Sequence, residues 1–197
     1  MLFKEFGFDN RILTSIGHLG FDVATEIQAR AIPEAMAGRD LLASSKTGSG
    51  KTLAYLLPAL HRVYKKKALS KRDPRVVILV PTRELAKQVY GQLRLLLASS
   101  RFTSILIQGG ENFNDQHKSL QKDPHFIVAT PGRLVDHLKQ RHVFLEGLEL
   151  LILDEADRML DLGFADAMRA INDAANHRQR QTLFFSATLD NTDVSAI

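Results

Sequence analysis

The segment from residue 40 to 52 constrains the fold of this chain more than any other part of its sequence. Three apolar residues, Leu41, Leu42 and Ala43, lead into a turn that contains Gly48 and Gly50. Glycine adopts backbone angles closed to other residues and leaves room for backbone N–H groups to approach a phosphate. An apolar helical surface follows, formed by Leu53, Tyr55, Leu56, Leu57 and Leu60. The segment therefore predicts a strand, a phosphate-binding turn and a helix, in that order.

We interpret this turn as a site for a nucleoside triphosphate and Mg²⁺. Lys51 would reach the β- and γ-phosphates, and the Thr52 hydroxyl would ligate Mg²⁺ at a helix N-terminus, which favours anions. The general pattern of such turns begins with glycine, whereas this chain has Ser45 there. The predicted phosphate-binding residues are Ser45, Lys46, Thr47, Gly48, Ser49, Gly50, Lys51 and Thr52. The alternative is a glycine turn with an incidental lysine.

Composition narrows the class of protein. The chain has 197 residues, of which 45% are hydrophobic, which suits one well-buried domain. It has no cysteine, so disulfides, thiolate catalysis and cysteine-bearing zinc sites are excluded. We find no signal peptide and no apolar run long enough for a membrane span, and we therefore expect a cytoplasmic protein without a membrane partner.

Basic charge is concentrated in one connection. The formal charge is +4, but residues 62–75 hold seven Lys or Arg against one Asp, so this segment carries +6 and the remainder −2. Such a segment can add non-specific attraction to nucleic acid. It can equally be a solvated loop between a helix and a strand.

Polar or glycine-rich groups follow five further apolar runs. The runs 76–80, 104–107, 126–129, 150–153 and 182–185 end at Pro81-Thr82-Arg83, Gln108-Gly109-Gly110, Thr130-Pro131-Gly132-Arg133, Asp154-Glu155-Ala156-Asp157 and Ser186-Ala187-Thr188. Apolar strands that alternate with amphipathic helices predict an α/β domain with a mostly parallel central sheet flanked by helices on both faces. Ligands of such sheets bind beyond the carboxyl ends of the strands. All six groups are expected at that edge.

Two carboxylates at this edge are candidates for chemistry. Asp154 could hold Mg²⁺ directly or through water, and Glu155 could orient and deprotonate an attacking water. Both could instead cap the following helix. The hydroxyls of Ser186 and Thr188 could reach Asp157 and link nucleotide state to the rest of the edge, or serve a local turn.

The N-terminal part is predicted to be helical. Apolar spacing predicts one helix that stops at Gly20 and a second that starts near Thr25, with a kink at Pro33. Gln28 lies in the second helix. Its amide could match the N6/N7 edge of adenine or could be an ordinary surface glutamine.

These motifs, in this order, resemble those of the DEAD-box ATP-dependent RNA helicases. The resemblance covers nearly the whole chain and only the first of that family's two RecA-like domains. It implies that Gln28 recognises adenine, that Phe21 stacks on it, and that Thr25 and Phe3 belong to the same site. Ala24 stands where the family usually has Pro. Residues 1–37 would form the Q-motif region, and residues 38–197 the RecA-like ATP-binding domain 1.

The resemblance also implies an RNA-facing surface. The family's backbone-gripping motifs correspond here to Pro81, Thr82 and Arg83, to Gly109 and Gly110, and to Thr130, Pro131, Gly132 and Arg133. Such contacts hold single-stranded or duplex RNA by its sugar-phosphate backbone without reading sequence. The second RecA-like domain would supply arginine fingers, which this chain lacks. The chain alone is therefore expected to bind ATP and Mg²⁺, to hydrolyse ATP poorly and not to unwind duplexes.

Three other functions stay open from the sequence. A GTPase is disfavoured because no Asn-Lys-x-Asp run is present, although another P-loop enzyme such as a transport ATPase is possible. A non-catalytic RNA-binding or assembly module could keep the nucleotide site as a switch. A DNA helicase is the third, and Asp157 favours RNA only through the resemblance.

Overall fold

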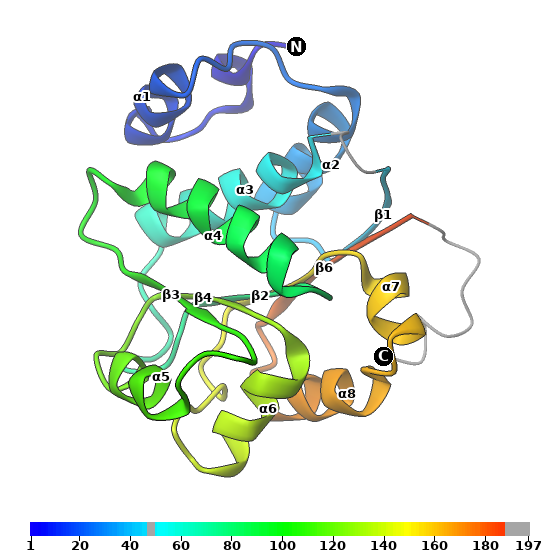
Figure 1. Cartoon of the computed structure of the whole chain (residues 1–197). Coiled ribbons are helices and arrows are strands. Elements are labelled where there is room, and N and C mark those ends of the chain that lie inside the picture. The colour runs from blue at the N-terminus through cyan, green and yellow to red at the C-terminus, as the bar shows by residue number, and fades with distance from the viewer. Residues whose placement is uncertain (47–49, 188–197) are drawn as a thin grey trace.

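The computed structural model describes residues 1–46 and 50–187, and its centre is a six-stranded sheet (Figure 1). The strand order is β1-β6-β5-β2-β4-β3, and all five pairings are parallel. The strands are β1 (Leu41–Ser44), β2 (Val76–Leu79), β3 (Ser104–Ile107), β4 (Phe126–Ala129), β5 (Leu150–Leu153) and β6 (Gln181–Ser186). The predicted α/β fold with a mostly parallel sheet is confirmed.

Helices cover both faces of the sheet (Figure 1). One face carries α2 (Glu26–Met36), α3 (Lys51–Lys65) and α4 (Arg83–Leu97), and the other carries α5 (Phe113–Leu120), α6 (Pro131–Lys139) and α8 (Ala165–Ala174). The short helix η1 (Phe3–Phe6) and α1 (Asn10–His18) lie outside the first layer, and α7 (Ala156–Asp161) follows β5. None of the described helices has the length and apolar content needed to cross a membrane.

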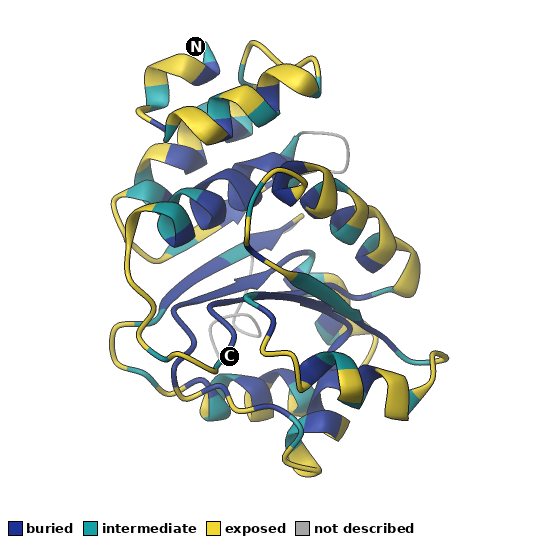
Figure 2. Ribbon diagram, turned by 90° about the vertical axis from the view of Figure 1, so that its left-hand side faces the viewer, coloured by how far each residue is buried: buried dark blue, intermediate teal, exposed yellow. Residues whose placement is uncertain are grey.

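The sheet separates two hydrophobic clusters, which explains its uninterrupted apolar runs. Along β2, Val76 and Ile78 belong to the cluster under α3 and α4, while Val77 and Leu79 belong to the cluster under α6 and α8. All four residues are fully buried, as the dark centre of Figure 2 shows. A strand covered on both faces cannot alternate apolar and polar residues.

The N-terminal region packs onto the same domain. Its buried residues share one cluster with α3 and α4, and a bridge between Leu2 and Val23 ties its start to the segment before α2. The helix α1 ends at His18, two residues before the predicted stop, and α2 begins after Thr25 and continues through Pro33. The division between residues 1–37 and 38–197 stays a prediction.

Candidate nucleotide-binding site

Lys51, Asp154 and Glu155 meet at the carboxyl edge of the sheet. Lys51 Nζ lies 2.9 Å from Asp154 Oδ1 and 3.1 Å from Glu155 Oε2. Lys51 is the first residue of α3, whereas the two carboxylates follow β5. Since β6 separates β1 from β5 in the sheet, the lysine reaches across one strand to make these contacts. The structure thus brings Lys51 together with two adjacent carboxylates, and the separation between Lys51 and Glu155 is 104 positions in the sequence.

The turn before Lys51 depends on Gly50. This glycine caps α3 with a φ of 86°, in the left-handed region. A Cβ atom at Gly50 would lie 2.6 Å from Gln28 Nε2 and 2.8 Å from the Thr25 hydroxyl. Both the backbone angle and the close approach of α2 therefore require glycine here. Gly50 and the start of α2 are therefore in close contact.

Asp154 is fully buried and only partly satisfied. Tyr55 Oη donates a hydrogen bond of 2.7 Å to Asp154 Oδ2. Asp154 Oδ1 has the ion pair with Lys51 but no hydrogen bond among the described residues. Burial raises the pKa of Asp154, and Lys51 and Tyr55 offset this only in part. Burial also opposes the charge of Lys51, but the two carboxylates outweigh it and raise the pKa of Lys51.

Tyr55 was not predicted as a site residue, because its position suited the apolar surface of α3. It is completely buried, and burial together with the charge of Asp154 raises the pKa of its hydroxyl well above the usual value. Tyr55 follows Lys51 by four residues in α3, so both side chains lie on one helix face. That spacing is the signal that could have identified it.

Glu155 has an unusual backbone conformation. Its φ of 53° places it in the left-handed region, between the end of β5 and the start of α7. Such a conformation costs a residue with a side chain about 1–3 kcal/mol. The carboxylate also contacts Arg158 Nη1 at 3.4 Å and is 18% exposed. Glu155 is therefore held at the edge of the site with its carboxylate partly open to solvent.

The residues present fit a magnesium ion shared with a ligand. The buried Asp154 Oδ1, whose partner among the described residues is Lys51, is a hard oxygen donor, and Thr52 offers a hydroxyl one residue after Lys51. Among the described residues no three His, Cys, Asp or Glu side chains form a metal site of their own. Mg²⁺ commonly takes one or two protein ligands and completes its shell with phosphates and water. Asp154 and Thr52 are suited to this kind of coordination.

Gln28 lies in α2, as predicted, and contacts Gly50. Its Oε1 accepts a hydrogen bond of 2.9 Å from Thr25 N, and its Nε2 donates one of 2.9 Å to Gly50 O. The Thr25 hydroxyl in turn accepts from Gln28 N, which completes a capping box. Gln28 is 3% exposed, so it connects the start of α2 to the turn. Its recognition of adenine stays a prediction.

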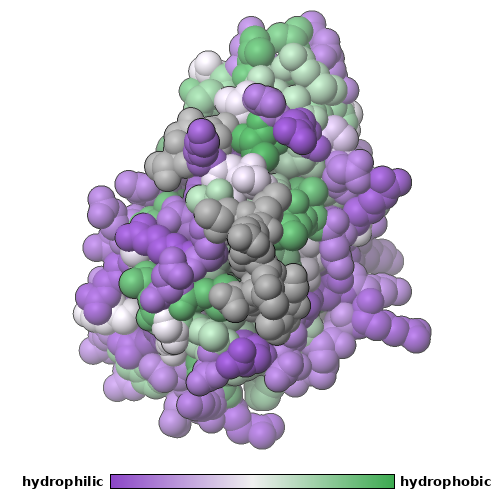
Figure 3. Space-filling view, turned by 90° about the vertical axis from the view of Figure 1, so that its right-hand side faces the viewer, coloured by the Kyte–Doolittle hydropathy of each residue, from purple (hydrophilic) through white to green (hydrophobic). Residues whose placement is uncertain are grey.

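The two predicted aromatic residues differ in exposure. Phe21 is 44% exposed, whereas Phe3 is 3% exposed and packs against Phe6 at 6.2 Å between ring centroids. A hollow of about 450 Å³ lies nearby, lined by residues that include Thr25, Ser45 and the exposed Lys46. Figure 3 views the molecule from the side on which β6 ends, where hydrophobic patches interrupt a mainly hydrophilic surface. Phe3 is thus part of the hydrophobic core, and the stacking of Phe21 on adenine stays a prediction.

Ser45 and Ser186 link the two strands that flank the turn. Ser45 N donates a hydrogen bond of 2.9 Å to Ser186 O, and both residues are buried. Asp157 lies in the first turn of α7. The remaining predicted residues of the turn and of the coupling motif, Thr47, Gly48, Ser49 and Thr188, lie outside the described residues.

Two of the predicted RNA-facing groups contact each other. The guanidinium of Arg83 lies over Gly109 and Gly110, where a Cβ atom on Gly110 would be 2.4 Å from Arg83 Nη1. Gly110 has a φ of 84°. Thr82 caps α4 by accepting a hydrogen bond of 3.2 Å from Leu85 N, after the buried Pro81. The absence of a side chain at Gly110 therefore lets the Arg83 guanidinium lie close to the backbone at this edge.

Arg133 is fixed by a residue that the sequence did not single out. Gln116 Oε1 accepts hydrogen bonds from Arg133 Nε at 3.0 Å and pairs with His137 Nε2 at 2.8 Å. Gln116 Nε2 donates to Gln108 O, directly before Gly109. Burial, together with His142 and Arg133, lowers the pKa of His137 to about 4. Gln116 thereby connects two of the predicted RNA-facing groups.

The third group starts α6. Thr130 and Pro131 are buried at its first turn. A Cβ atom placed on Gly132 would lie 3.8 Å from the Phe164 ring. All the predicted RNA-facing residues lie directly after β2, β3 or β4. Since these strands are parallel neighbours, the three groups share one edge with Lys51 and Asp154. Whether they bind RNA stays a prediction.

A parallel sheet of this order, with a lysine and two carboxylates at its carboxyl edge, defines a RecA-like α/β domain. The model of the DEAD/DEAH box helicase family matches residues 25–197. The chain belongs to this family, as its motifs predicted.

Curated relatives agree. The chain is 47% identical over 190 residues to the probable ATP-dependent RNA helicase ddx27 of Dictyostelium discoideum, covering 96% of this chain and 24% of the relative. It is 41% identical over 188 residues to the ATP-dependent RNA helicase HAS1 of Candida albicans, covering 95% and 33%. It is 43% identical over 187 residues to has1 of Emericella nidulans, covering 94% and 31%. The chain thus spans about a quarter to a third of the length of these relatives.

Proposed function

We propose that this chain is the ATP-binding and RNA-contacting half of an ATP-dependent RNA helicase. In the full-length protein, ATP binding and hydrolysis would be coupled to local unwinding of RNA duplexes or remodelling of RNA–protein complexes. The observation that carries the proposal is the cluster of Lys51, Asp154 and Glu155, with contacts of 2.9 and 3.1 Å, in a family whose curated relatives are named ATP-dependent RNA helicases.

Each residue of the cluster has a distinct part in this proposal. Lys51 would exchange its carboxylate partners for the β- and γ-phosphates of ATP. Asp154 and Glu155 raise the pKa of Lys51, so the side chain is positively charged before the phosphates bind. Asp154 and Thr52 would hold Mg²⁺, which neutralises charge on the phosphates. Glu155, released from Lys51, would accept a proton from a water placed beside its partly exposed carboxylate.

The chain alone is proposed to bind ATP but to hydrolyse it slowly. The described cations that contact the carboxylates are Lys51 and Arg158. An arginine finger from a second domain contributes roughly 10³ to 10⁵ in kcat in related phosphoryl-transfer enzymes. The missing contribution would come from the second RecA-like domain of the full-length protein.

Substitution of Glu155 by Gln in the full-length protein tests the catalytic proposal. We expect ATP affinity, measured by calorimetry, to be retained and RNA-stimulated kcat to fall by roughly 10² to 10⁴. A nucleotide-switched RNA-binding module without catalysis would show no turnover to lose. Competition between ATP and GTP for the unmodified chain provides the control for base selectivity, and equal affinity for both would contradict the adenine site.

A further inference from the structure

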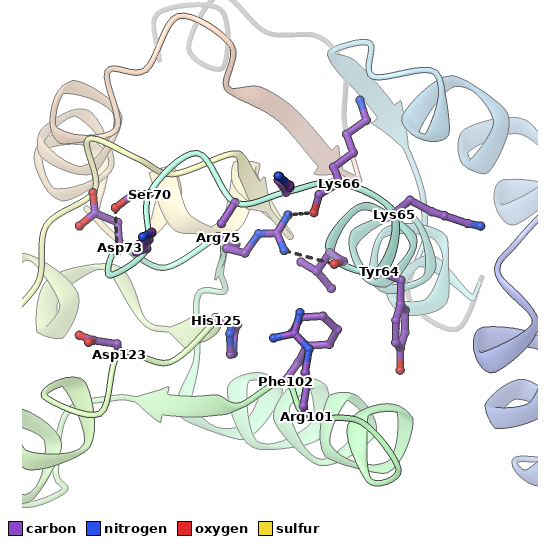
Figure 4. A pocket seen from close by; sticks show the side chains of 14 residues that line it. Tyr64, Lys65, Lys66, Ser70, Asp73, Arg75, Arg101, Phe102, Asp123 and His125 are labelled. Atoms are coloured by element: carbon purple, nitrogen blue, oxygen red, sulfur yellow. Dashed lines mark hydrogen bonds between the residues drawn. The ribbon is translucent and has the colours of Figure 1, made fainter.

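A second cavity lies at the opposite edge of the sheet. It has a volume of about 440 Å³ and is bounded by the segments that precede β2, β3 and β4 (Figure 4). Its basic lining residues are Lys65, Lys66, Lys67, Lys71, Arg75 and Arg101. We call it the basic pocket. Because it adjoins the amino ends of parallel strands, it is separate from the nucleotide site.

Arg75, a buried residue of the pocket lining, is held by several hydrogen bonds. Arg75 forms two hydrogen bonds with Glu149, of 2.9 and 3.0 Å, and Arg62 adds a third at 3.1 Å. Arg75 also donates to Val63 O and Lys66 O, two of the contacts drawn in Figure 4. Its charge is compensated by Glu149, and its contacts fix the backbone from which the lysines extend. The basic segment 62–75 is therefore attached to the domain through Arg75 and Glu149.

Four cations of the pocket have no anionic partner. Lys66, Lys67, Lys71 and Arg101 make no ion pair within the described part of the chain, whereas Lys65 lies 3.6 Å from Asp9. Arg101 is held over the ring of Phe102 at 4.6 Å, which orients its guanidinium without neutralising it. Four positive charges at one cavity attract an anion.

The distribution of charge favours binding of an anion at one end of the cavity. Asp73 and Asp123 lie at the end opposite Arg101, Phe102 and Tyr64 (Figure 4). Asp73 Oδ2 already accepts a hydrogen bond of 2.9 Å from Gly147 N. His125 also lines the pocket, and burial, with smaller contributions from the charges of Arg101 and Arg75, lowers its pKa.

We propose that the basic pocket binds the phosphodiester backbone of RNA outside the strand held at the carboxyl edge of the sheet. This inference rests on the proposed RNA-binding function and adds a second contact to it. Lysines on flexible stems bind phosphates as point charges and do not read bases. Phe102 is only 7% exposed, so it offers no stacking surface. Binding is therefore independent of sequence.

An acidic protein segment is the competing ligand. It would need fixed donors for its carboxylates, and the one buried arginine of the lining, Arg75, is already occupied by Glu149, which leaves Arg101 as the only lining arginine available among the described residues. The remaining lysines suit a regularly spaced polyanion, whose counterions are released on binding. The structure therefore favours RNA.

The test compares oligouridines of two lengths, about 6 and about 25 nucleotides, by fluorescence anisotropy at several salt concentrations. The variant is the triple substitution Lys67→Ala, Lys71→Ala and Arg101→Ala in this chain. The matched control removes three exposed charges elsewhere, by Lys4→Ala, Lys118→Ala and Lys139→Ala. Thermal unfolding and ATP affinity confirm that both variants are folded.

We expect the triple variant to bind the long oligomer roughly tenfold more weakly. The slope of log K against log salt concentration should become shallower by about two, because each phosphate contact contributes about 0.7 for a single strand. The short oligomer and the control variant should be unchanged. An equal loss of affinity for both oligomer lengths, or an equal loss in the variant and the control, overturns the proposal that the basic pocket binds RNA. Pocket-dependent binding of polyglutamate without any effect on RNA assigns it to an acidic protein and overturns the proposal. Failure of the unmodified chain to bind either oligomer would overturn the proposed RNA function as well.

Discussion

Two buried carboxylates at the two ends of β5 differ in how completely they are satisfied. Glu149 directly precedes the strand and Asp154 directly follows it, and both are 0% exposed. Glu149 accepts hydrogen bonds from Arg75, Arg62 and Leu69 N. Within the described part of the chain, Asp154 has one contact at each oxygen: the ion pair of Oδ1 with Lys51 and the hydrogen bond that Oδ2 accepts from Tyr55.

The difference separates a structural ion cluster from a binding site. Burial of a charge is tolerated when partners use its lone pairs, as at Glu149. Asp154 Oδ1 has only the ion pair with Lys51 among the described residues, and Lys51 is itself shared with Glu155, so Oδ1 keeps the capacity to bind a ligand. The same strand is therefore anchored at its amino end and left incomplete at its carboxyl end. Four predictions test this comparison.

Removal of the Glu149 carboxylate should have the largest effect. Glu149→Ala leaves Arg62 and Arg75 as uncompensated charges in the interior, and breaking a buried pair in this way costs about 3–5 kcal/mol. Urea denaturation followed by circular dichroism measures the loss. Glu146→Ala, at an exposed position of the same loop, is the control and should change stability by less than about 0.5 kcal/mol. Equal stability of the two variants would show that the cluster is not an anchor.

Substitution of Asp154 by Asn should affect ligand binding more than stability. The variant keeps the shape of the side chain and leaves Lys51 paired with Glu155, so the free energy of unfolding should change by only about 1 kcal/mol. Mg²⁺-dependent ATP affinity should fall by at least about 100-fold, because a ligand of the metal is lost. Calorimetric titration with and without Mg²⁺ measures this. Destabilisation as large as that of Glu149→Ala would remove the distinction between the two ends.

Removal of the Tyr55 hydroxyl should produce a smaller change at the same site. Tyr55→Phe deletes the hydrogen bond that orients Asp154, and such supporting contacts are worth about 10- to 100-fold in metal affinity. A Mg²⁺ titration of nucleotide binding measures the shift. Tyr64→Phe serves as the control, since Tyr64 contacts Arg11 through its ring face. Unchanged Mg²⁺ dependence would mean that Lys51 alone positions Asp154.

The carboxyl end of β5 could be predicted from the sequence because parallel strands align their ends. Once β1 and β5 were identified as strands of one sheet, Lys51, Asp154 and Glu155 had to lie near the same edge. Their meeting required no knowledge of side-chain conformation. Tyr55 was missed because a tyrosine among leucines suits an apolar helix face equally well, and only the packing of α3 directs its hydroxyl toward Asp154.

The amino end could not be predicted in the same way. Arg75 and Glu149 lie 74 residues apart, and each looked like an ordinary charged residue next to a strand. Their pairing depends on the register between β2 and β5, which aligns Val76 with Leu150. Charge counting placed Arg62 and Arg75 in a solvated loop or a nucleic-acid contact, whereas the structure uses both to bury Glu149. Register is a property of the whole sheet that local patterns do not contain.

The smallest predicted effect concerns the backbone at the carboxyl end. Glu155 has a left-handed φ of 53°, whereas Glu149 is not among the described residues with positive φ. Glu155→Gly and Glu155→Ala both delete the contacts with Lys51 and Arg158, but only glycine relieves the strain at this angle. The glycine variant should therefore be more stable than the alanine variant by about 1 kcal/mol in urea denaturation. If alanine were the more stable of the two, the strain would be absent, and the carboxyl end of β5 would differ from the amino end only in the smaller number of partners of its buried carboxylate.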